Sequence, residues 1–209
     1  MPSTSRHTLY YIHDPMCSWC WGFKPLLQQL EQQLPESVDM KYLLGGLAAD
    51  SQQAMPDDMK NFLQQTWRSI QLKIPGTPFN FDFWTLCQPR RSTHIACRAV
   101  IAARRQHVDY EKQMISAIQQ AYYLNARNPS DQKVLTALAI DLKLDTVAFT
   151  ADLNSPATQE ILQQEIHLSQ RLGAQGFPSL ILVNGEVCST VALDYNHLAV
   201  NLQQIMALI

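Results

Sequence analysis

The stretch DPMCSWCWGF, residues 14–23, places two cysteines, Cys17 and Cys20, three positions apart. The run before it, HTLYYIH (7–13), is aromatic and β-branched and ends at an Asp-Pro pair, which predicts a short strand. Behind the cysteines, apolar side chains recur at helical spacing as far as Pro35. The cysteine pair is therefore expected where a strand passes into a helix.

The segment after this helix predicts a second strand, VDMKYLLGG (38–46), followed by a long helical region. From about residue 50 to residue 172 the apolar positions follow helical spacing, and the sequence shows no strand pattern. The predicted helices cover residues 57–74, 93–107, 110–126, 131–142, 145–153 and 155–172. An aromatic loop, TPFNFDFW (77–84), predicts either an apolar lip of an active site or a core contact between two subdomains.

The last part of the chain returns to a strand pattern. The buried-looking run PSLILV (178–183) and EVCSTV (186–191) flank Asn184-Gly185, which is a strong hairpin signal. The remaining residues, 193–209, have the spacing of an amphipathic helix. The chain thus ends as a β-β-α unit.

The order of these units predicts the fold class. A β-α-β unit and a β-β-α unit separated by about 120 helical residues indicate an α/β, thioredoxin-like fold with an inserted all-helical subdomain. Residues 1–50 and 173–209 are expected to form the thioredoxin-like domain. Residues 51–172 are expected to form the insertion.

Composition excludes several classes of partner. The chain has 209 residues, 46% hydrophobic, with 16 basic and 18 acidic side chains and no basic run longer than two residues, so nucleic acid is not expected as a partner. No apolar stretch approaches the roughly 20 residues that span a bilayer, so a membrane is not expected either. The N-terminal MPSTSRHTLYYIH lacks the apolar core of a signal peptide. We therefore expect a cytoplasmic location.

Cysteine usage then limits the chemistry. Five cysteines are present, at positions 17, 20, 87, 97 and 188. In a reducing compartment this odd number does not predict a structural disulfide framework, so a C-x-x-C pair is either catalytic or metal-binding. Zinc normally takes four ligands, and no second locally spaced pair is visible beyond His94 and Cys97. No metal is predicted.

Cys97 and Cys188 are expected to have no redox role, whereas a disulfide between Cys87 and Cys97 is conceivable but has no support in the sequence. Cys97 and Cys188 lie in apolar patterns, which predicts small buried hydrophobic side chains. Cys87, in the loop TLCQPRR, is the one most expected to be exposed.

The two cysteines of the pair are expected to differ. At a helix start, unpaired backbone N–H groups and the helix dipole stabilise negative charge, which can lower a cysteine pKa from about 8.5 to about 3.5. Because the thiolate is the nucleophile in disulfide exchange, Cys17 is predicted to attack. Cys20, almost one turn further in and more buried, is predicted to resolve the mixed disulfide.

Three neighbours of the pair are further candidates. Ser18 and Trp19, between the cysteines, carry no formal charge, and Trp19 can either offer an apolar surface to a protein substrate or pack into the core. His13 precedes Cys17 by four residues, and its positive form could stabilise the thiolate.

The pair Phe177-Pro178 opens the returning hairpin. With a cis bond, the chain would turn sharply beside the active site and leave the Phe177 backbone free to pair with a substrate strand. An ordinary trans proline at an edge strand is the alternative.

DPMCSWCWGF, followed across the helical stretch by GFPSLILVNGE, resembles the DsbA family of thioredoxin-fold oxidoreductases, and within it the cytosolic FrnE-like branch. The resemblance covers essentially the whole chain and implies thiol–disulfide exchange with protein substrates. It implies Cys17 as nucleophile, Cys20 as resolving thiol and Pro178 as a cis-proline. No cofactor beyond the redox-active disulfide is expected, and glutathione is a candidate reductant.

Two positions depart from that family pattern. Members commonly carry a buried carboxylate six residues before the nucleophile, where this chain has Tyr11. Asp14, in the loop closer to the thiol, is expected to oppose thiolate formation by its charge.

Other function classes remain open. One is a glutathione-dependent isomerase or transferase of the kappa or hydroxychromene carboxylate isomerase type, acting on small aromatic substrates; those related enzymes typically have serine at the nucleophile position. A second is a zinc-loaded scaffold, and a third is a peptide-binding holdase that uses the Trp19 and Phe177 surface.

Overall fold

The computed structural model describes residues 7–209. The prediction that the N-terminus is not a signal peptide falls partly on residues 1–6, which lie outside the described residues. The strands are β1 (His7–His13), β2 (Val38–Leu44), β3 (Ser179–Asn184) and β4 (Val187–Val191). They form one sheet in the order β2-β1-β3-β4, in which β1 pairs in parallel with β2 and antiparallel with β3.

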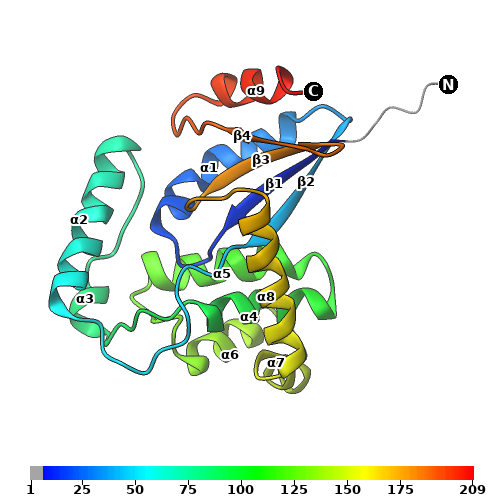
Figure 1. Ribbon diagram of the computed structural model, residues 1–209. Helices are drawn as coiled ribbons and strands as arrows, with labels where there is room; N and C mark the ends of the chain where they lie inside the picture. The colour runs from blue at the N-terminus through cyan, green and yellow to red at the C-terminus, as the bar shows by residue number, and fades with distance from the viewer. Residues whose placement is uncertain (1–6) are drawn as a thin grey trace.

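Helices cover both faces of this sheet and form the rest of the molecule (Figure 1). They are α1 (Ser18–Gln33), α2 (Asp57–Lys73), α3 (Phe83–Leu86), α4 (His94–Gln106), α5 (Tyr110–Tyr123), α6 (Gln132–Asp141), α7 (Thr146–Leu153), α8 (Pro156–Arg171) and α9 (Leu198–Met206). α1 and α9 lie on one face of the sheet, and α8 lies on the other (Figure 1). The predicted thioredoxin-like α/β fold with a helical insertion is confirmed.

The alternation of side chains along the strands explains the two layers. Leu9 and Tyr11 of β1 point to the face covered by α1 and α9, where they pack with Phe23. Ile12 points to the opposite face, where Leu168 of α8 is part of the same cluster. Because α8 belongs to the predicted insertion yet covers the sheet, the division at residues 50 and 172 stays a prediction.

The aromatic loop at residues 77–84 packs into the core of the insertion, and its Pro78 carbonyl accepts a hydrogen bond from the Trp21 indole of α1. Of its two predicted roles, the core contact between the subdomains is the one observed. The end of the loop forms the short helix α3, which the sequence pattern did not predict. The loop packs around Trp67 of α2, whose ring centroid lies 4.8 to 6.2 Å from six other rings. Those rings belong to Phe79, Phe81, Phe83, Trp84, Tyr122 and Tyr123.

Replacing Trp67 by alanine is expected to lower the free energy of unfolding by about 3 kcal/mol, because a large buried ring is lost and a cavity remains. The loss falls at the lower end of the usual range, since the half-buried rings of the loop can move partly into the space. Phe62→Ala, on the same helix but at a side chain 60% exposed, is the matched control and should change stability by about 0.5 kcal/mol or less. Urea unfolding of both variants measures the difference, and equal losses would contradict this account of the core.

The hairpin turn lies one residue later than predicted. Asn184 pairs with Val187, so the two loop residues are Gly185 and Glu186 rather than Asn184-Gly185. Gly185 has a φ of +61°, a backbone conformation that favours glycine and that a two-residue hairpin needs at its first loop position.

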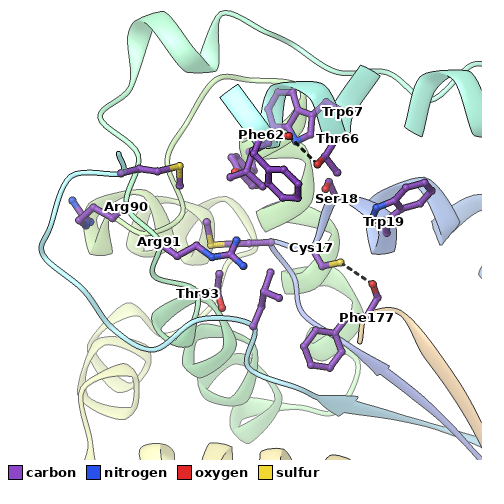
Figure 2. Close-up of a pocket in the computed structure, with 15 residues that line it drawn as sticks. Cys17, Ser18, Trp19, Phe62, Thr66, Trp67, Arg90, Arg91, Thr93 and Phe177 are labelled. Carbon is purple, nitrogen blue, oxygen red and sulfur yellow. Dashed lines mark hydrogen bonds between the residues drawn. The ribbon is translucent and has the colours of Figure 1, made fainter. Parts of the chain in front are cut away.

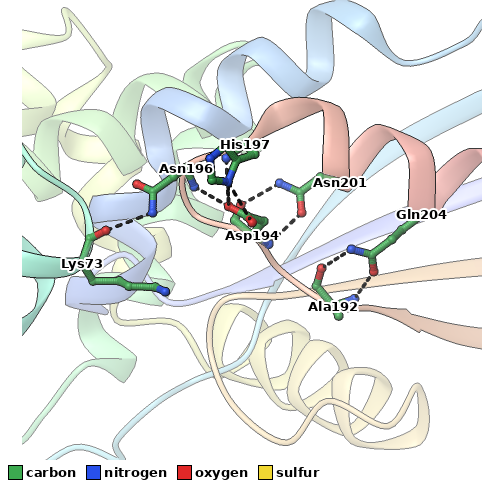
Figure 3. Close-up of polar contacts among 7 residues, drawn as sticks. All are labelled: Lys73, Ala192, Asp194, Asn196, His197, Asn201 and Gln204. Atoms are coloured by element: carbon green, nitrogen blue, oxygen red, sulfur yellow. Dashed lines mark hydrogen bonds and ion pairs between the residues drawn. The ribbon is translucent and has the colours of Figure 1, made fainter.

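The C-terminal helix begins later than the predicted 193–209, because side chains take up the backbone groups of the preceding loop (Figure 3). The Asp194 carboxylate accepts hydrogen bonds from the backbone N–H groups of Asn196 at 2.8 Å and His197 at 2.9 Å. The Asn201 side chain bonds both the N–H and the carbonyl of Asp194. These bonds hold the loop in a turn, and α9 starts only after it.

Candidate active site

Cys17 lies at the point where the sequence predicts it, in the turn between β1 and α1. It is the N-cap residue of α1, and its backbone N–H donates to the Asp14 carbonyl at 3.0 Å. The side chain is 6% exposed and lines a cavity of about 210 Å³ (Figure 2). Cys20 lies almost one turn further along α1 and is fully buried. Both sulfurs are free thiols.

The hairpin that begins with Phe177-Pro178 reaches this turn. The bond between the two residues is cis, and the Cys17 thiol donates to the Phe177 carbonyl, 3.4 Å from sulfur to oxygen (Figure 2). The Phe177 ring packs directly on Gly45, at the end of β2, where any side chain would overlap it. The predicted second strand ends in two glycines, and the sequence does not show why. The Phe177 ring explains why residue 45 is a glycine.

The environments of the two thiols differ. Burial raises the pKa of the Cys20 thiol well above its ordinary value, and the hydrogen bond and charge of Cys17 raise it further. Tyr11, at the position of the family's buried carboxylate, lies against Cys20, and burial raises the pKa of its phenol as well. Cys20 is therefore held as a neutral thiol behind Cys17, beside a phenol that is also neutral.

Asp14 joins the segments that surround Cys17. Its buried carboxylate accepts hydrogen bonds from the backbone of Met16 and of Leu47, both at 2.8 Å, and from the Thr93 hydroxyl at 2.6 Å. Burial raises the pKa of this carboxyl, and the three bonds oppose that rise. At Cys20 its charge is one of the smaller causes of the raised pKa, whereas its predicted effect at Cys17 stays a prediction.

His13 does not have the charge proposed for it. Its ring is buried, stacks on Tyr11 at 5.0 Å, and has no hydrogen-bond partner at either nitrogen within residues 7–209. Burial, helped by the positive charge of Arg104, lowers the pKa of His13 to about 3. The prediction of a positive His13 that stabilises a thiolate is therefore wrong, because at neutral pH the ring is uncharged.

Ser18 and Trp19 both line the cavity. Trp19 is half-buried and packs on Tyr195 of the C-terminal loop, with ring centroids 5.2 Å apart. It thus combines the two roles left open for it, since one side packs on the protein and another borders the cavity. Trp21 instead stacks on Tyr123 of the insertion.

The far wall of the cavity comes from segments that the sequence did not connect with the cysteines. α2 supplies Phe62, Leu63, Thr66 and Trp67, and the loop before α4 supplies Arg90, Arg91 and Thr93. The helical stripe on α2 and the Arg-Arg pair were visible in the sequence, but nothing in their spacing indicates nearness to Cys17. Only the packing of the insertion brings them there (Figure 2).

The other cysteines do not line this cavity, although the Cys97 thiol donates to the Asp14 carboxylate, 3.5 Å from sulfur to oxygen. Cys97 is fully buried, as predicted, and Cys87 is half-buried with its thiol 3.0 Å from the Ala126 carbonyl. Cys188 was predicted to be buried but is exposed, because β4 is the edge strand and α9 covers only its end at Val191. Within residues 7–209, no three His, Cys, Asp or Glu side chains are grouped so that they could hold a metal ion.

A buried thiol behind a helix-capping thiol, with a cis-proline loop in contact, defines a thioredoxin-fold dithiol site. The model of the thioredoxin family matches residues 10–199, and the chain belongs to this family. The resemblance to DsbA-type proteins is thus confirmed for family and fold.

Similar proteins of known structure share this fold over nearly the whole chain. A candidate protein disulfide isomerase from Nitrosomonas europaea is 25% identical, with a TM-score of 0.84 and 97% of each chain covered. The cytosolic disulfide reductase DsbM from Pseudomonas aeruginosa is 24% identical, with a TM-score of 0.76 over 96% of this chain and 98% of that one. DsbM has also been solved with glutathione.

Curated relatives at a similar level of identity belong to a different functional class. The ClpXP adapter protein SpxH from Bacillus subtilis is 24% identical over 178 residues, 84% of this chain and 58% of that protein. The chain therefore spans less than two thirds of the length of the curated relatives it matches. None of the helices formed by residues 7–209 has the length and apolar character needed to cross a membrane.

Proposed function

We propose that this protein is a cytoplasmic thiol–disulfide oxidoreductase that reduces or isomerises disulfides of other proteins. The observation that carries the proposal is the asymmetry of the two thiols. Cys17 borders the cavity and faces the Phe177 carbonyl, whereas Cys20 is buried one turn behind with a raised pKa. An attacking and a resolving thiol require this arrangement.

In the reductive direction, the Cys17 thiolate attacks one sulfur of a substrate disulfide. A mixed disulfide forms, and the second substrate sulfur leaves as a thiolate that takes up a proton. Cys20 then loses its proton and attacks Cys17, which closes the Cys17–Cys20 disulfide and releases the first substrate thiol. Two electrons pass from the protein dithiol to the substrate.

The Phe177 segment is proposed to bind the substrate chain. Its carbonyl already accepts from the Cys17 thiol at 3.4 Å, so a substrate strand lying along it would bring its cysteine to the nucleophile. Ser18 and Trp19 line the same cavity as Phe177, and Pro178 is proposed to complete the contact surface.

Glutathione is proposed as the reductant. Two glutathione molecules would reduce the Cys17–Cys20 disulfide and leave as glutathione disulfide, so no further cofactor is needed. The structure of DsbM with glutathione supports this choice, as does the open cavity beside Cys17.

The test is the reduction potential of the pair. The protein is equilibrated in glutathione buffers of graded poise, and its disulfide is quantified by mass spectrometry. A single two-electron transition confined to Cys17 and Cys20 is expected. If no disulfide forms between them at any poise, the proposal fails.

An adapter role is the second candidate, because the matching curated relatives are ClpXP adapter proteins. An adapter binds its protein partner without consuming a dithiol. Partner delivery that is unchanged when Cys17 and Cys20 are both replaced by serine would favour this role over disulfide exchange.

A further inference from the structure

The charged side chains that line the cavity beside Cys17 are both positive. Among the described side chains that line it, only Arg90 and Arg91 are charged, and no carboxylate is among them. The rest of the lining is largely apolar, including Phe62, which is mostly exposed although its ring is large. A substrate segment that enters this cavity therefore meets a positive charge and an apolar wall within reach of the nucleophile.

The two arginines differ in what they bind. Arg90 donates to the Asp131 carboxylate and to the Ser130 carbonyl, each at 2.5 Å. Arg91 makes no ion pair and no hydrogen bond with any of residues 7–209. Arg90 is a structural link, whereas the Arg91 guanidinium keeps all of its donors for another group.

The carboxylates close to this loop are already engaged. Asp50 pairs with Arg98 at 2.7 Å, and Asp131 pairs with Arg90. Asp14 is buried and accepts from the Thr93 hydroxyl and from two backbone N–H groups. Within the described residues, Arg91 therefore has no counter-ion of its own, which is unusual for a half-buried guanidinium.

The backbone around Arg91 is held on both sides. Arg90 forms a β-bridge with Ala54, and the Ser92 carbonyl accepts from the Ser130 hydroxyl at 2.7 Å. The side chain of Arg91 extends from this fixed loop into the cavity toward Cys17 (Figure 2). The backbone position of Arg91 is thus set by the fold before any ligand binds, so binding has only to order the side chain.

We propose that Arg91 determines specificity by binding a carboxylate of the disulfide-bearing substrate while Cys17 attacks the disulfide. This inference rests on the proposed function, and it adds a substrate class, namely cysteinyl disulfides with a carboxylate close to the reacting sulfur. A guanidinium matches a carboxylate in a bidentate pair, which positions as well as attracts. The carboxylate can come from an acidic side chain of a protein or from glutathione.

The test uses the fully reduced protein and measures single-turnover rates, so that no external reductant enters. One substrate is a peptide with an internal disulfide and Glu beside one cysteine, and the second is identical except for Gln at that position. The wild type is expected to reduce the Glu peptide about tenfold faster than the Gln peptide, and Arg91→Gln is expected to reduce the two peptides at equal rates. Arg91→Lys should restore part of the preference.

Two further arms complete the design. Arg68→Gln, an exposed arginine of α2 outside the cavity, controls for the loss of one positive charge and should keep the preference. The comparison is repeated with glutathione disulfide and with its ethyl ester, in which a carboxylate is blocked, to test the small-molecule source of the carboxylate. An Arg91-dependent preference in either pair supports the assignment and identifies the source.

The two possible failures are distinguishable. Reduction of all substrates without an Arg91-dependent preference overturns the role of Arg91 and leaves disulfide exchange intact. If the wild type reduces none of the disulfides, the proposed function is overturned, and the role of Arg91 is overturned with it.

Discussion

Replacing Cys17 by serine is expected to lower the rate of disulfide reduction by about a thousandfold or more, because a hydroxyl cannot replace the thiolate as nucleophile. Cys20→Ser is expected to behave differently. Cys17 still attacks in that variant, but the mixed disulfide cannot be resolved, so a covalent complex between Cys17 and the substrate accumulates. The structural reason is the burial of Cys20 behind Cys17, which gives only Cys17 access to the cavity.

Single-turnover reduction of a protein disulfide, followed by non-reducing electrophoresis and mass spectrometry, measures both variants. Cys188→Ser is the control, because Cys188 is also a free cysteine but is exposed on β4 and does not line the cavity, and this variant should keep the wild-type rate. Release of fully reduced substrate by Cys20→Ser, with no mixed disulfide accumulating, would exclude the two-thiol mechanism. It would favour the glutathione-dependent isomerase or transferase, which needs no resolving cysteine.

His13 is expected to make the fold sensitive to acid. Because burial and the charge of Arg104 lower its pKa from 6.5 to about 3, the unfolded chain takes up a proton in a pH range where the folded protein does not. The stability linked to the neutral form of His13 is fully present above pH 6.5 and is lost as the pH falls toward 3. Each pH unit in this window removes up to about 1.4 kcal/mol, so the total approaches 5 kcal/mol.

His13→Phe tests this expectation. The imidazole stacks on Tyr11 and has no hydrogen-bond partner at either nitrogen within the described part of the chain, so a phenyl ring should preserve the packing. The free energy of unfolding at pH 7 should be kept or increased. Its decrease between pH 6.5 and pH 3 should become smaller by the amount that His13 contributes in the wild type. His167→Phe, at an exposed histidine of α8, is the control and should follow the wild type. The free energy of unfolding is measured by urea at several pH values. If it falls with pH equally for the wild type and for His13→Phe, the assignment is contradicted.

Local patterns in the sequence predicted the elements of the fold and the reactive residues at their junctions. The aromatic and β-branched composition of HTLYYIH and the helical spacing after Cys20 are local features, and both predicted the observed elements. The hairpin signal at Asn184-Gly185 was correct in kind but one residue early. Turn geometry depends on strand register, which the neighbouring strand β1 helps to set.

Properties that depend on burial were the least predictable. His13 and Cys188 look alike in the sequence, as polar or small residues within strands. One lies in the central strand beneath helices and loses its charge, whereas the other lies on the edge strand and meets solvent. Desolvation is a sum over all neighbouring elements, and no short window of sequence contains that sum.

The sequence by itself determined the dithiol, its place at the start of a helix, and the strand and helix order of the family. The tertiary structure alone decided what surrounds the dithiol. Phe62, Arg91 and Phe177 are distant from Cys17 along the chain, and they border one cavity because the insertion packs against the end of the sheet. Substrate choice therefore depends on long-range packing, whereas the chemistry of the thiols depends on a short motif that the sequence displays directly.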